Sequence, residues 1–179
     1  MLYFIRHGQS AANEKGLFAG QREDSPLTRK GEEQARIAGE ELLEREIHID
    51  KIVSSPLRRA LDTAKIIAKV IGMSEEEIEQ DVRLAEYDMG ALTGQIRKEG
   101  ITSKEMISAE GAEDPRAFML RVLEVFGQLS QEEDESILVC THAGVGRILE
   151  AYQNDIAPEE FYSIPAYPNA QILKMESIE

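Results

Sequence analysis

The sequence contains one cysteine, no tryptophan and no apolar run that approaches the length needed to cross a membrane. With Cys140 alone, the 179-residue chain has no intramolecular disulfide and no cysteine-cluster metal site, which fits a reducing compartment. Residues 1–7 lack the basic and then long apolar order of a signal peptide. We therefore expect a cytoplasmic protein with no membrane partner.

Basic side chains are also scarce. The chain carries 20 Lys plus Arg against 34 Asp plus Glu, a formal net charge of −14. Nucleic acid and anionic lipid both need a basic surface that displaces counterions, so we expect neither as a partner. The positive charge is concentrated, because residues 1–30 carry five basic and three acidic side chains and residues 51–72 carry five and one. This distribution predicts a locally basic cleft for a small anion.

No repeat, low-complexity block or linker divides the chain, so we expect a single domain over residues 1–179. Short apolar runs predict strands at 2–5, 52–53 and 136–141, with a weaker candidate at 170–175. Helical patterns predict helices at 31–45 and 57–71. Two further helices are expected to begin at Asp114-Pro115 and near Gly144, and a short acidic helix is expected after Ser74. The alternation predicts an α/β fold, a three-layer αβα sandwich with a mostly parallel central sheet.

Two of the three histidines follow predicted strands. His7 comes directly after the first strand and His142 after the strand that ends at Thr141, and both precede small residues. In parallel sheets, ligands bind beyond the carboxyl ends of the strands. We therefore expect His7 and His142 to meet at the ligand site, and His48 to lie at the surface.

Arginines accompany these histidines. Arg6 precedes His7, and Arg58-Arg59 follows Ser54-Ser55-Pro56, where a strand gives way to a helix. Two guanidinium groups beside a histidine would bind phosphoryl oxygens and favour the neutral, nucleophilic imidazole. Glu86, which we expect at the end of a strand formed by residues 82–84, is a candidate proton donor for the leaving oxygen. This set predicts phosphate chemistry.

These residues resemble the histidine phosphatase superfamily, which includes the cofactor-dependent phosphoglycerate mutases. The matching motifs stand in the family's order along most of the chain: Arg6-His7-Gly8 with Asn13, Pro26-Leu27-Thr28 with Gly31 and Gln34-Ala35, Ser54-Ser55 with Arg59-Ala60 and Thr63-Ala64, Leu84-x-Glu86 with Gly90, and Thr141-His142-Ala143-Gly144-Val145. Five ordered motifs are a specific signal. The resemblance implies a phosphoglycerate mutase-like fold.

The resemblance also implies roles. His7 would be the nucleophile that forms a phosphohistidine, and Glu86 would be the acid and later the base. Arg59 is preferred to Arg58, because the family's arginine immediately precedes Ala. The remaining residues implied to bind the phosphoryl group or substrate are Arg6, Asn13, Gly20, Arg59 and His142. No metal or other cofactor is implied.

The stretch from Glu86 to His142 is shorter than in the mutases, whose long insertion supplies basic residues for the glycerate carboxylate. We therefore expect a phosphatase that acts on a small phosphorylated metabolite. A small insertion at about 95–114 should lie near the active site, where Arg97, Lys98 and Lys104 are either solvated or in contact with substrate.

Four alternatives remain. Two keep the chemistry: a protein phosphohistidine phosphatase and a phosphoglycerate mutase-type phosphotransferase. A binding protein without turnover is disfavoured, because it would need neither a nucleophile nor a proton donor. A metal site built from His7, His142 and Glu86 is disfavoured because the flanking arginines would repel a dication. Cys140 in an apolar strand is expected to be a buried hydrophobe and not a nucleophile.

Overall fold

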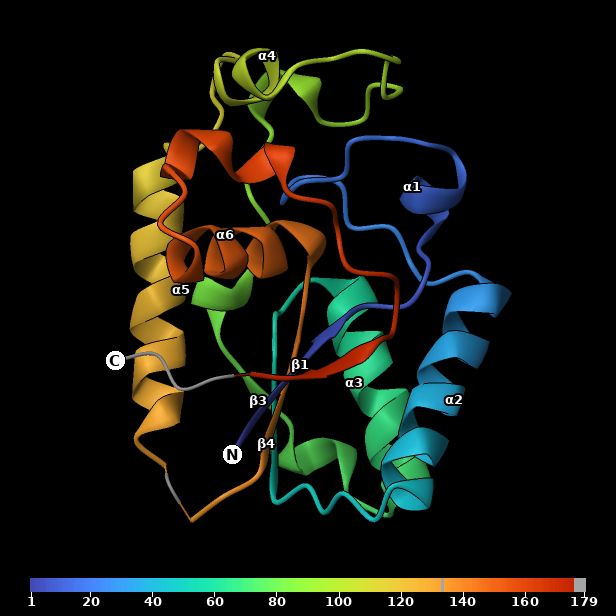
Figure 1. The fold of residues 1–179 in the computed structure, drawn as a ribbon. Helices are drawn as coiled ribbons and strands as arrows, with labels where there is room; N and C mark the ends of the chain where they lie inside the picture. The colour runs from blue at the N-terminus through green and yellow to red at the C-terminus, as the bar shows by residue number, and fades with distance from the viewer. Residues whose placement is uncertain (133, 176–179) are drawn as a thin grey trace.

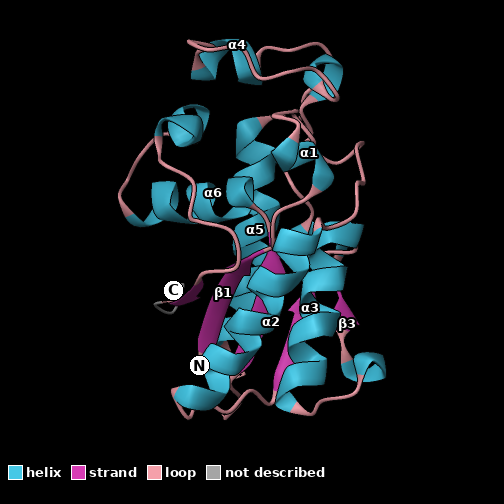
Figure 2. Ribbon diagram, turned by 90° about the vertical axis from the view of Figure 1, so that its right-hand side faces the viewer, coloured by secondary structure: helices cyan, strands magenta, loops and turns pink. Residues whose placement is uncertain are grey.

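The computed structural model describes residues 1–132 and 134–175. In these residues one five-stranded sheet is flanked by helices on both faces (Figures 1 and 2). The strands are β1 (Leu2–Arg6), β2 (Lys51–Ser54), β3 (Glu79–Gln80), β4 (Ile137–Thr141) and β5 (Ile172–Lys174). The predicted α/β fold is confirmed, and so is the weaker candidate strand near the end of the chain.

The sheet order brings distant parts of the sequence together. The order is β3-β2-β4-β1-β5, with only β5 antiparallel to its neighbour. Arg6 pairs with Thr141, and Ser54 pairs with Cys140, so β1, β4 and β2 end at the same level. The next residues continue the ladder, because His7 N donates to Thr141 O at 2.9 Å and Ser55 N donates to Cys140 O at 2.9 Å. Three strand ends thus converge on one edge.

The long helices form the two outer layers. Figure 1 shows α2 (Arg29–Glu44) and α3 (Arg58–Ile71) on one side of the sheet, and α5 (Pro115–Ser130) and α6 (Ala143–Gln153) on the other. The short elements are α1 (Ala11–Glu14), α4 (Ser103–Ile107) and the 3₁₀ helices η1 (Glu75–Glu77), η2 (Val82–Leu84), η3 (Gly90–Leu92) and η4 (Pro158–Ser163). The predicted three-layer arrangement is therefore correct.

Strand alternation sends side chains into two cores. Tyr3 and Ile5 pack with residues of α2 and α3, whereas Phe4 packs with residues of α5 and α6. Each fully buried large apolar side chain contributes about 1.5–3 kcal/mol. Cys140 is fully buried in the first core, and burial raises the pKa of its thiol. The prediction that Cys140 is a buried hydrophobe is confirmed.

Helix starts follow the sequence signals. Thr28 accepts a hydrogen bond from Gly31 N at 3.1 Å, so α2 begins at Arg29, two residues before the predicted start. Asp114 caps α5 by accepting from the amides of Arg116 and Ala117, both at 3.0 Å. Ser74 makes the predicted capping box, but the helix that follows is only the single turn η1.

The prediction of a strand at 82–84 is wrong. These residues form η2, because the Asp81 carboxylate accepts from Arg83 N at 2.8 Å and closes a turn. Val82 is 75% exposed, and Leu84 is the one fully buried side chain of this turn. Glu86 therefore reaches the site from an extended segment after a 3₁₀ turn and not from a strand end.

Residues 95–114 lie away from the sheet, with α4 at the far end of the molecule (Figure 2). Bridges between Leu17 and Ile96 and between Met89 and Ala112 attach this segment to the body. A single domain with an insertion here stays a prediction. Within the described part of the chain, no helix combines the length and apolarity needed to traverse a bilayer.

Candidate active site

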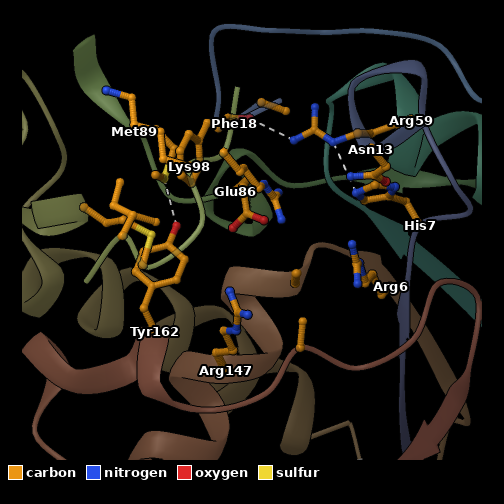
Figure 3. A pocket seen from close by; sticks show the side chains of 17 residues that line it. Arg6, His7, Asn13, Phe18, Arg59, Glu86, Met89, Lys98, Arg147 and Tyr162 are labelled. Atoms are coloured by element: carbon orange, nitrogen blue, oxygen red, sulfur yellow. Dashed lines mark hydrogen bonds between the residues drawn. The ribbon is translucent and has the colours of Figure 1, made fainter. Parts of the chain in front are cut away.

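A cavity of about 310 Å³ lies at the edge where the strands converge (Figure 3). Six of the seven predicted site residues line it: Arg6, His7, Asn13, Gly20, Arg59 and Glu86. The seventh, His142, is fully buried, with its ring centroid 5.2 Å from that of His7. The structure thus brings the predicted residues together, with His142 packed against His7.

His7 is held as a neutral imidazole. Its Nδ1 lies 2.7 Å from Gly8 O, and a carbonyl only accepts, so Nδ1 carries the proton. The unprotonated Nε2 accepts from Arg59 Nε at 3.2 Å. Burial, followed by the charges of Arg59 and Arg6, holds the pKa of His7 well below its usual value. The nitrogen that faces Arg59 therefore keeps its lone pair at neutral pH.

Arg59 is anchored by backbone carbonyls. It is 1% exposed at the start of α3, and its terminal nitrogens donate to Gly20 O at 2.8 Å and to Glu23 O at 3.1 Å. Gly20 has φ +57°, the left-handed region that favours glycine. Arg58 instead is exposed and pairs with Asp62. The preference for Arg59 over Arg58 agrees with this geometry.

Arg6 completes the pair of guanidinium groups beside His7. Its Nη1 donates to Tyr167 O at 2.8 Å, and burial is the main cause that lowers its pKa to about 10. Its Nε is buried without a hydrogen-bond partner among the described residues. Buried donors with a net positive charge are suited to an anion.

Glu86 is positioned by backbone amides. Its carboxylate accepts from Tyr87 N at 2.8 Å and from Gly144 N at 3.1 Å, in the first turn of α6. A Cβ on Gly144 would lie 2.1 Å from Glu86 Oε1, so any larger residue there would displace the carboxylate. This contact explains physically why glycine stands two residues after His142.

Arg121, which the sequence analysis did not single out, fixes the segment that carries Glu86. Its guanidinium uses all five N–H donors: three go to the carbonyls of Arg83 at 2.6 Å, Ala85 at 2.8 Å and Glu86 at 3.1 Å, and two to the Glu113 carboxylate at 2.7 and 2.9 Å. No local pattern identifies such a role, because the three carbonyls lie 35–38 positions earlier in the chain.

Two further side chains support the histidines. Asn169 Nδ2 donates to His7 O at 2.8 Å, and Ser55 Oγ lies 2.7 Å from His142 Nε2. Burial and the charge of Arg59 hold the pKa of His142 well below its usual value. His142 Nδ1 is buried and has no hydrogen-bond partner within the described part of the chain. Asn169 carries no signal in the sequence, whereas Ser55 stands at a predicted strand end.

Asn13 lines the cavity from α1. Its Oδ1 accepts from Ser10 N at 3.2 Å, which completes the capping box of that helix. Since Oδ1 is engaged in this cap, the Nδ2 donors are the atoms of Asn13 suited to a ligand oxygen.

The opposite wall of the cavity combines charge and apolar surface. Figure 3 shows Glu86 between the group of Arg6, His7 and Arg59 and the group of Met89, Lys98 and Tyr162. The wall residues are Phe18, Met89, Arg97, Lys98, Ile101, Met106, Arg147 and Tyr162. Arg97 and Lys98 thus reach the cavity, as one of the two readings expected, whereas Lys104 is exposed on α4. Arg147 and Tyr162 were not predicted as site residues.

Among residues 1–132 and 134–175, no three His, Cys, Asp or Glu side chains gather in a group that could hold a metal ion. His48 is 85% exposed in its side chain and pairs with Asp50, as predicted for a surface residue.

The model of the histidine phosphatase superfamily (branch 1) matches residues 2–179. The chain belongs to this superfamily. The resemblance based on five sequence motifs is therefore confirmed, and the fold is that of phosphoglycerate mutase-like members of the histidine phosphatase superfamily.

Relatives within the superfamily include phosphatases and mutases. A probable 2-carboxy-D-arabinitol-1-phosphatase of Arabidopsis thaliana is 32% identical over 171 residues, which cover 89% of this chain and 34% of that protein. A probable phosphoglycerate mutase, GpmB, of Citrobacter koseri is 46% identical over 91 residues, 51% of this chain and 40% of that protein. The matches thus span well under half the length of these curated relatives.

A solved structure extends the likeness to nearly the whole chain. Mycobacterial glucosyl-3-phosphoglycerate phosphatase, in complex with VO3, has a TM-score of 0.79 and 26% identity, covering 96% of this chain and 90% of the other.

Proposed function

We propose that this chain hydrolyses a small phosphomonoester without a metal, through a phosphohistidine intermediate on His7. The observation that carries the proposal is the state of His7: a buried, neutral imidazole whose unprotonated Nε2 lies beside Arg59 in a cavity also lined by Arg6 and Glu86. A nucleophile, an electrostatic clamp and a proton carrier are the parts that phosphoryl transfer requires.

In the first step, His7 Nε2 attacks phosphorus and the P–O ester bond breaks. Glu86, in its protonated form, gives its proton to the leaving oxygen. Arg6 and Arg59 bind the phosphoryl oxygens and stabilise the charge that develops there. His7 Nδ1 keeps its proton and continues to donate a hydrogen bond to Gly8 O, which stabilises the positive charge of the phosphorylated ring.

In the second step, water attacks the phosphorus of phosphohistidine. The Glu86 carboxylate takes a proton from that water, and the N–P bond breaks to regenerate neutral His7 and release inorganic phosphate. Asn13 would donate through Nδ2 to a phosphoryl oxygen, and His142 would donate through Nδ1, because its Nε2 is engaged with Ser55 Oγ. Gly20 would shape the pocket through the backbone that also anchors Arg59.

The cavity supports a metabolite over a protein substrate. At about 310 Å³, it lies at the lower end of the roughly 300–1,000 Å³ of small-molecule pockets. Phosphotransfer of the mutase type uses the same first step and remains the alternative. Analysis of the products distinguishes it from hydrolysis. Release of inorganic phosphate, without a phosphorylated isomer, is the expected product.

Turnover of 4-nitrophenyl phosphate in excess chelator tests the proposal. We expect wild-type activity to persist and His7→Asn to reduce kcat by at least about 10⁴-fold. His48→Asn is the matched control and should retain wild-type kcat, because His48 is exposed outside the cavity. Full activity in His7→Asn, or loss of wild-type activity on chelation, would overturn the proposal.

A further inference from the structure

A mostly buried ion pair ties the Glu86 segment (residues 83–88) to the rest of the molecule. Arg121 projects from α5, and its Nε lies 2.7 Å from Oε1 of Glu113, with the two side chains 18% and 16% exposed. Arg121 also donates to three carbonyls within residues 83–86. All five N–H donors of this guanidinium group therefore serve the Glu86 segment and its partner Glu113.

Glu113 holds the same segment from its other end. Its carboxylate accepts from Asp88 N at 3.2 Å, and its own backbone N–H donates to Asp88 O at 2.9 Å. The Tyr87 hydroxyl donates to Glu113 O. Glu113 stands near the end of residues 95–114, which lie away from the sheet and contribute side chains to the cavity wall. The ion pair thus joins that part of the wall to the backbone that carries Glu86.

A second contact leads from α5 to the Glu86 carboxylate itself. The guanidinium carbon of Arg121 lies 4.6 Å from the ring centroid of Phe118. The Phe118 ring packs beside α6, since a Cβ built on Gly144 would lie 3.5 Å from Phe118 Cζ. Gly144 N in turn donates to Glu86 Oε2 at 3.1 Å. Arg121 is absent from the described residues that line the cavity, so its influence on Glu86 passes through these contacts.

The charge of Arg121 also reaches a histidine of the site. It contributes to the lowered pKa of His142, after burial and the charges of Arg59 and His7. Lysine at position 121 would keep a positive charge, but its three N–H donors cannot reproduce a planar fork of five. Arg121→Lys therefore separates the geometry of the Glu86 segment from the electrostatics of the site.

We propose that Arg121 is a positioning residue for proton transfer: with Glu113 as its partner, it holds the Glu86 carboxyl group where it can donate its proton to the leaving oxygen. This inference rests on the proposed hydrolysis at His7 and assigns a role to a residue outside the cavity. The affected step is the transfer of that proton to the ester oxygen as the P–O bond breaks. A misplacement of about 1 Å at a reacting group can lower a rate by about 10²-fold.

Two esters of similar size test this role. Benzyl phosphate needs a proton on its leaving oxygen, whereas 4-nitrophenyl phosphate needs little. The comparison uses kcat/KM, which covers the steps up to release of the alcohol or phenol and leaves out hydrolysis of phosphohistidine. We expect Arg121→Lys to lower kcat/KM by at least about 30-fold for benzyl phosphate and by less than about threefold for 4-nitrophenyl phosphate. Arg116→Lys, at an exposed position on the same helix that pairs with Glu159, should change neither value.

A general loosening of the structure would give a different result. Equal losses for the two esters, or wild-type values for both in Arg121→Lys, would overturn the positioning role while hydrolysis at His7 stands. The Ki of inorganic phosphate should stay within about twofold of wild type, and a rise as large as the loss on benzyl phosphate would show that Arg121 supports phosphoryl binding instead. If Arg121→Lys does not fold, Glu113→Gln should show the same selective loss.

Hydrogen exchange reports the position of the carboxyl group without turnover. The amides of Tyr87 and Gly144 both donate to it, so they should exchange at least about fivefold faster in Arg121→Lys than in the wild type. The Gly31 amide, which donates to Thr28 Oγ1 at the start of α2, is the control. Unchanged exchange at both amides would overturn the positioning role. Faster exchange, together with a wild type that hydrolyses neither ester, would support the positioning of Glu86 and refute the hydrolysis.

Discussion

The two sides of the cavity are built differently. On the strand-end side, His7 and Arg59 are 3% and 1% exposed and are bonded to backbone atoms from separate parts of the chain. The distal side is the wall of the cavity opposite His7. There, Arg97 and Lys98 are exposed and lie in a segment between η3 and α4 without regular secondary structure. The fold therefore fixes the reacting groups in advance, whereas the exposed Arg97 and Lys98 can change with little cost to the core.

The largest expected effect comes from the strand-end side. Arg59→Met keeps an unbranched side chain but removes the guanidinium group and its charge beside His7, and we expect kcat for 4-nitrophenyl phosphate to fall by about 10²–10³-fold. Arg58→Met is the matched control one residue away, where the exposed side chain pairs with Asp62 in α3. Steady-state kinetics of the two variants check this, and equal losses would remove the distinction between the two arginines.

Gly144→Ala should have the next largest effect. The added Cβ would displace the Glu86 carboxylate, so we expect kcat to fall by about 10²-fold on an alkyl phosphate, whose leaving group needs a proton. The loss on 4-nitrophenyl phosphate should be smaller, because that leaving group departs without full protonation.

Gly127→Ala provides the control for helix propensity. Gly127 lies in α5, and a Cβ there would meet no other described atom within 4 Å beyond its chain neighbours and the backbone of its own helix. This variant should gain about 0.5–1 kcal/mol in free energy of unfolding with no change in kcat. If Gly144→Ala lowered kcat equally for the alkyl phosphate and for 4-nitrophenyl phosphate, Glu86 would not be acting as the acid.

Buried neutral histidines also make stability depend on pH. The pKa values of His7 and His142 are depressed in the folded protein, so the unfolded chain binds more protons below pH 6.5. Their contribution to stability is present above that pH and is lost as the pH falls below it, by about 1.4 kcal/mol per pH unit for each histidine.

Denaturant unfolding between pH 5 and 7 measures this slope. The slope reports how many more protons the unfolded chain binds than the folded protein. His142→Gln should reduce that number by about one relative to wild type, and His48→Gln, at an exposed position, should leave it at the wild-type value. An unchanged slope in His142→Gln would show that His142 titrates alike in the folded and unfolded states.

The smallest effect is expected on the distal side. Ile101→Ala removes apolar surface from the cavity wall, and we expect KM to rise about fivefold with a smaller change in kcat. Ile37→Ala, at a 50% exposed position on α2, is the control. A fall in kcat as large as that of Arg59→Met would contradict the division between the two sides.

Much of the strand-end side could be predicted from the sequence, because its signals are local. His7 and His142 each follow an apolar run, and parallel strands place such residues at one edge. Arg59 and Glu86 stand in short motifs. The positions of these residues after strands predict that they lie close together, and the family resemblance adds the role of each.

The parts that sequence reasoning missed depend on contacts between distant residues. Arg121 bonds to carbonyls 35–38 positions away, and Asn169 bonds to His7 across 162 positions. In the sequence, Arg147 is one charged residue on an amphipathic helix. Its place at the cavity depends on η4, which puts the Tyr162 ring beside it. The prediction of a strand at 82–84 was wrong because the periodicity of so short a run does not reveal the turn that Asp81 closes.

The central claim is that His7 becomes phosphorylated during turnover. The most direct measurement is rapid mixing with substrate, an alkaline quench that preserves phosphohistidine, and mass spectrometry of the peptide that contains His7. We predict a phosphoryl adduct on His7 that forms and decays at rates sufficient for steady-state turnover, and none in His7→Asn. An adduct on another residue, or turnover with no adduct at a rate faster than its measured decay, would contradict the account.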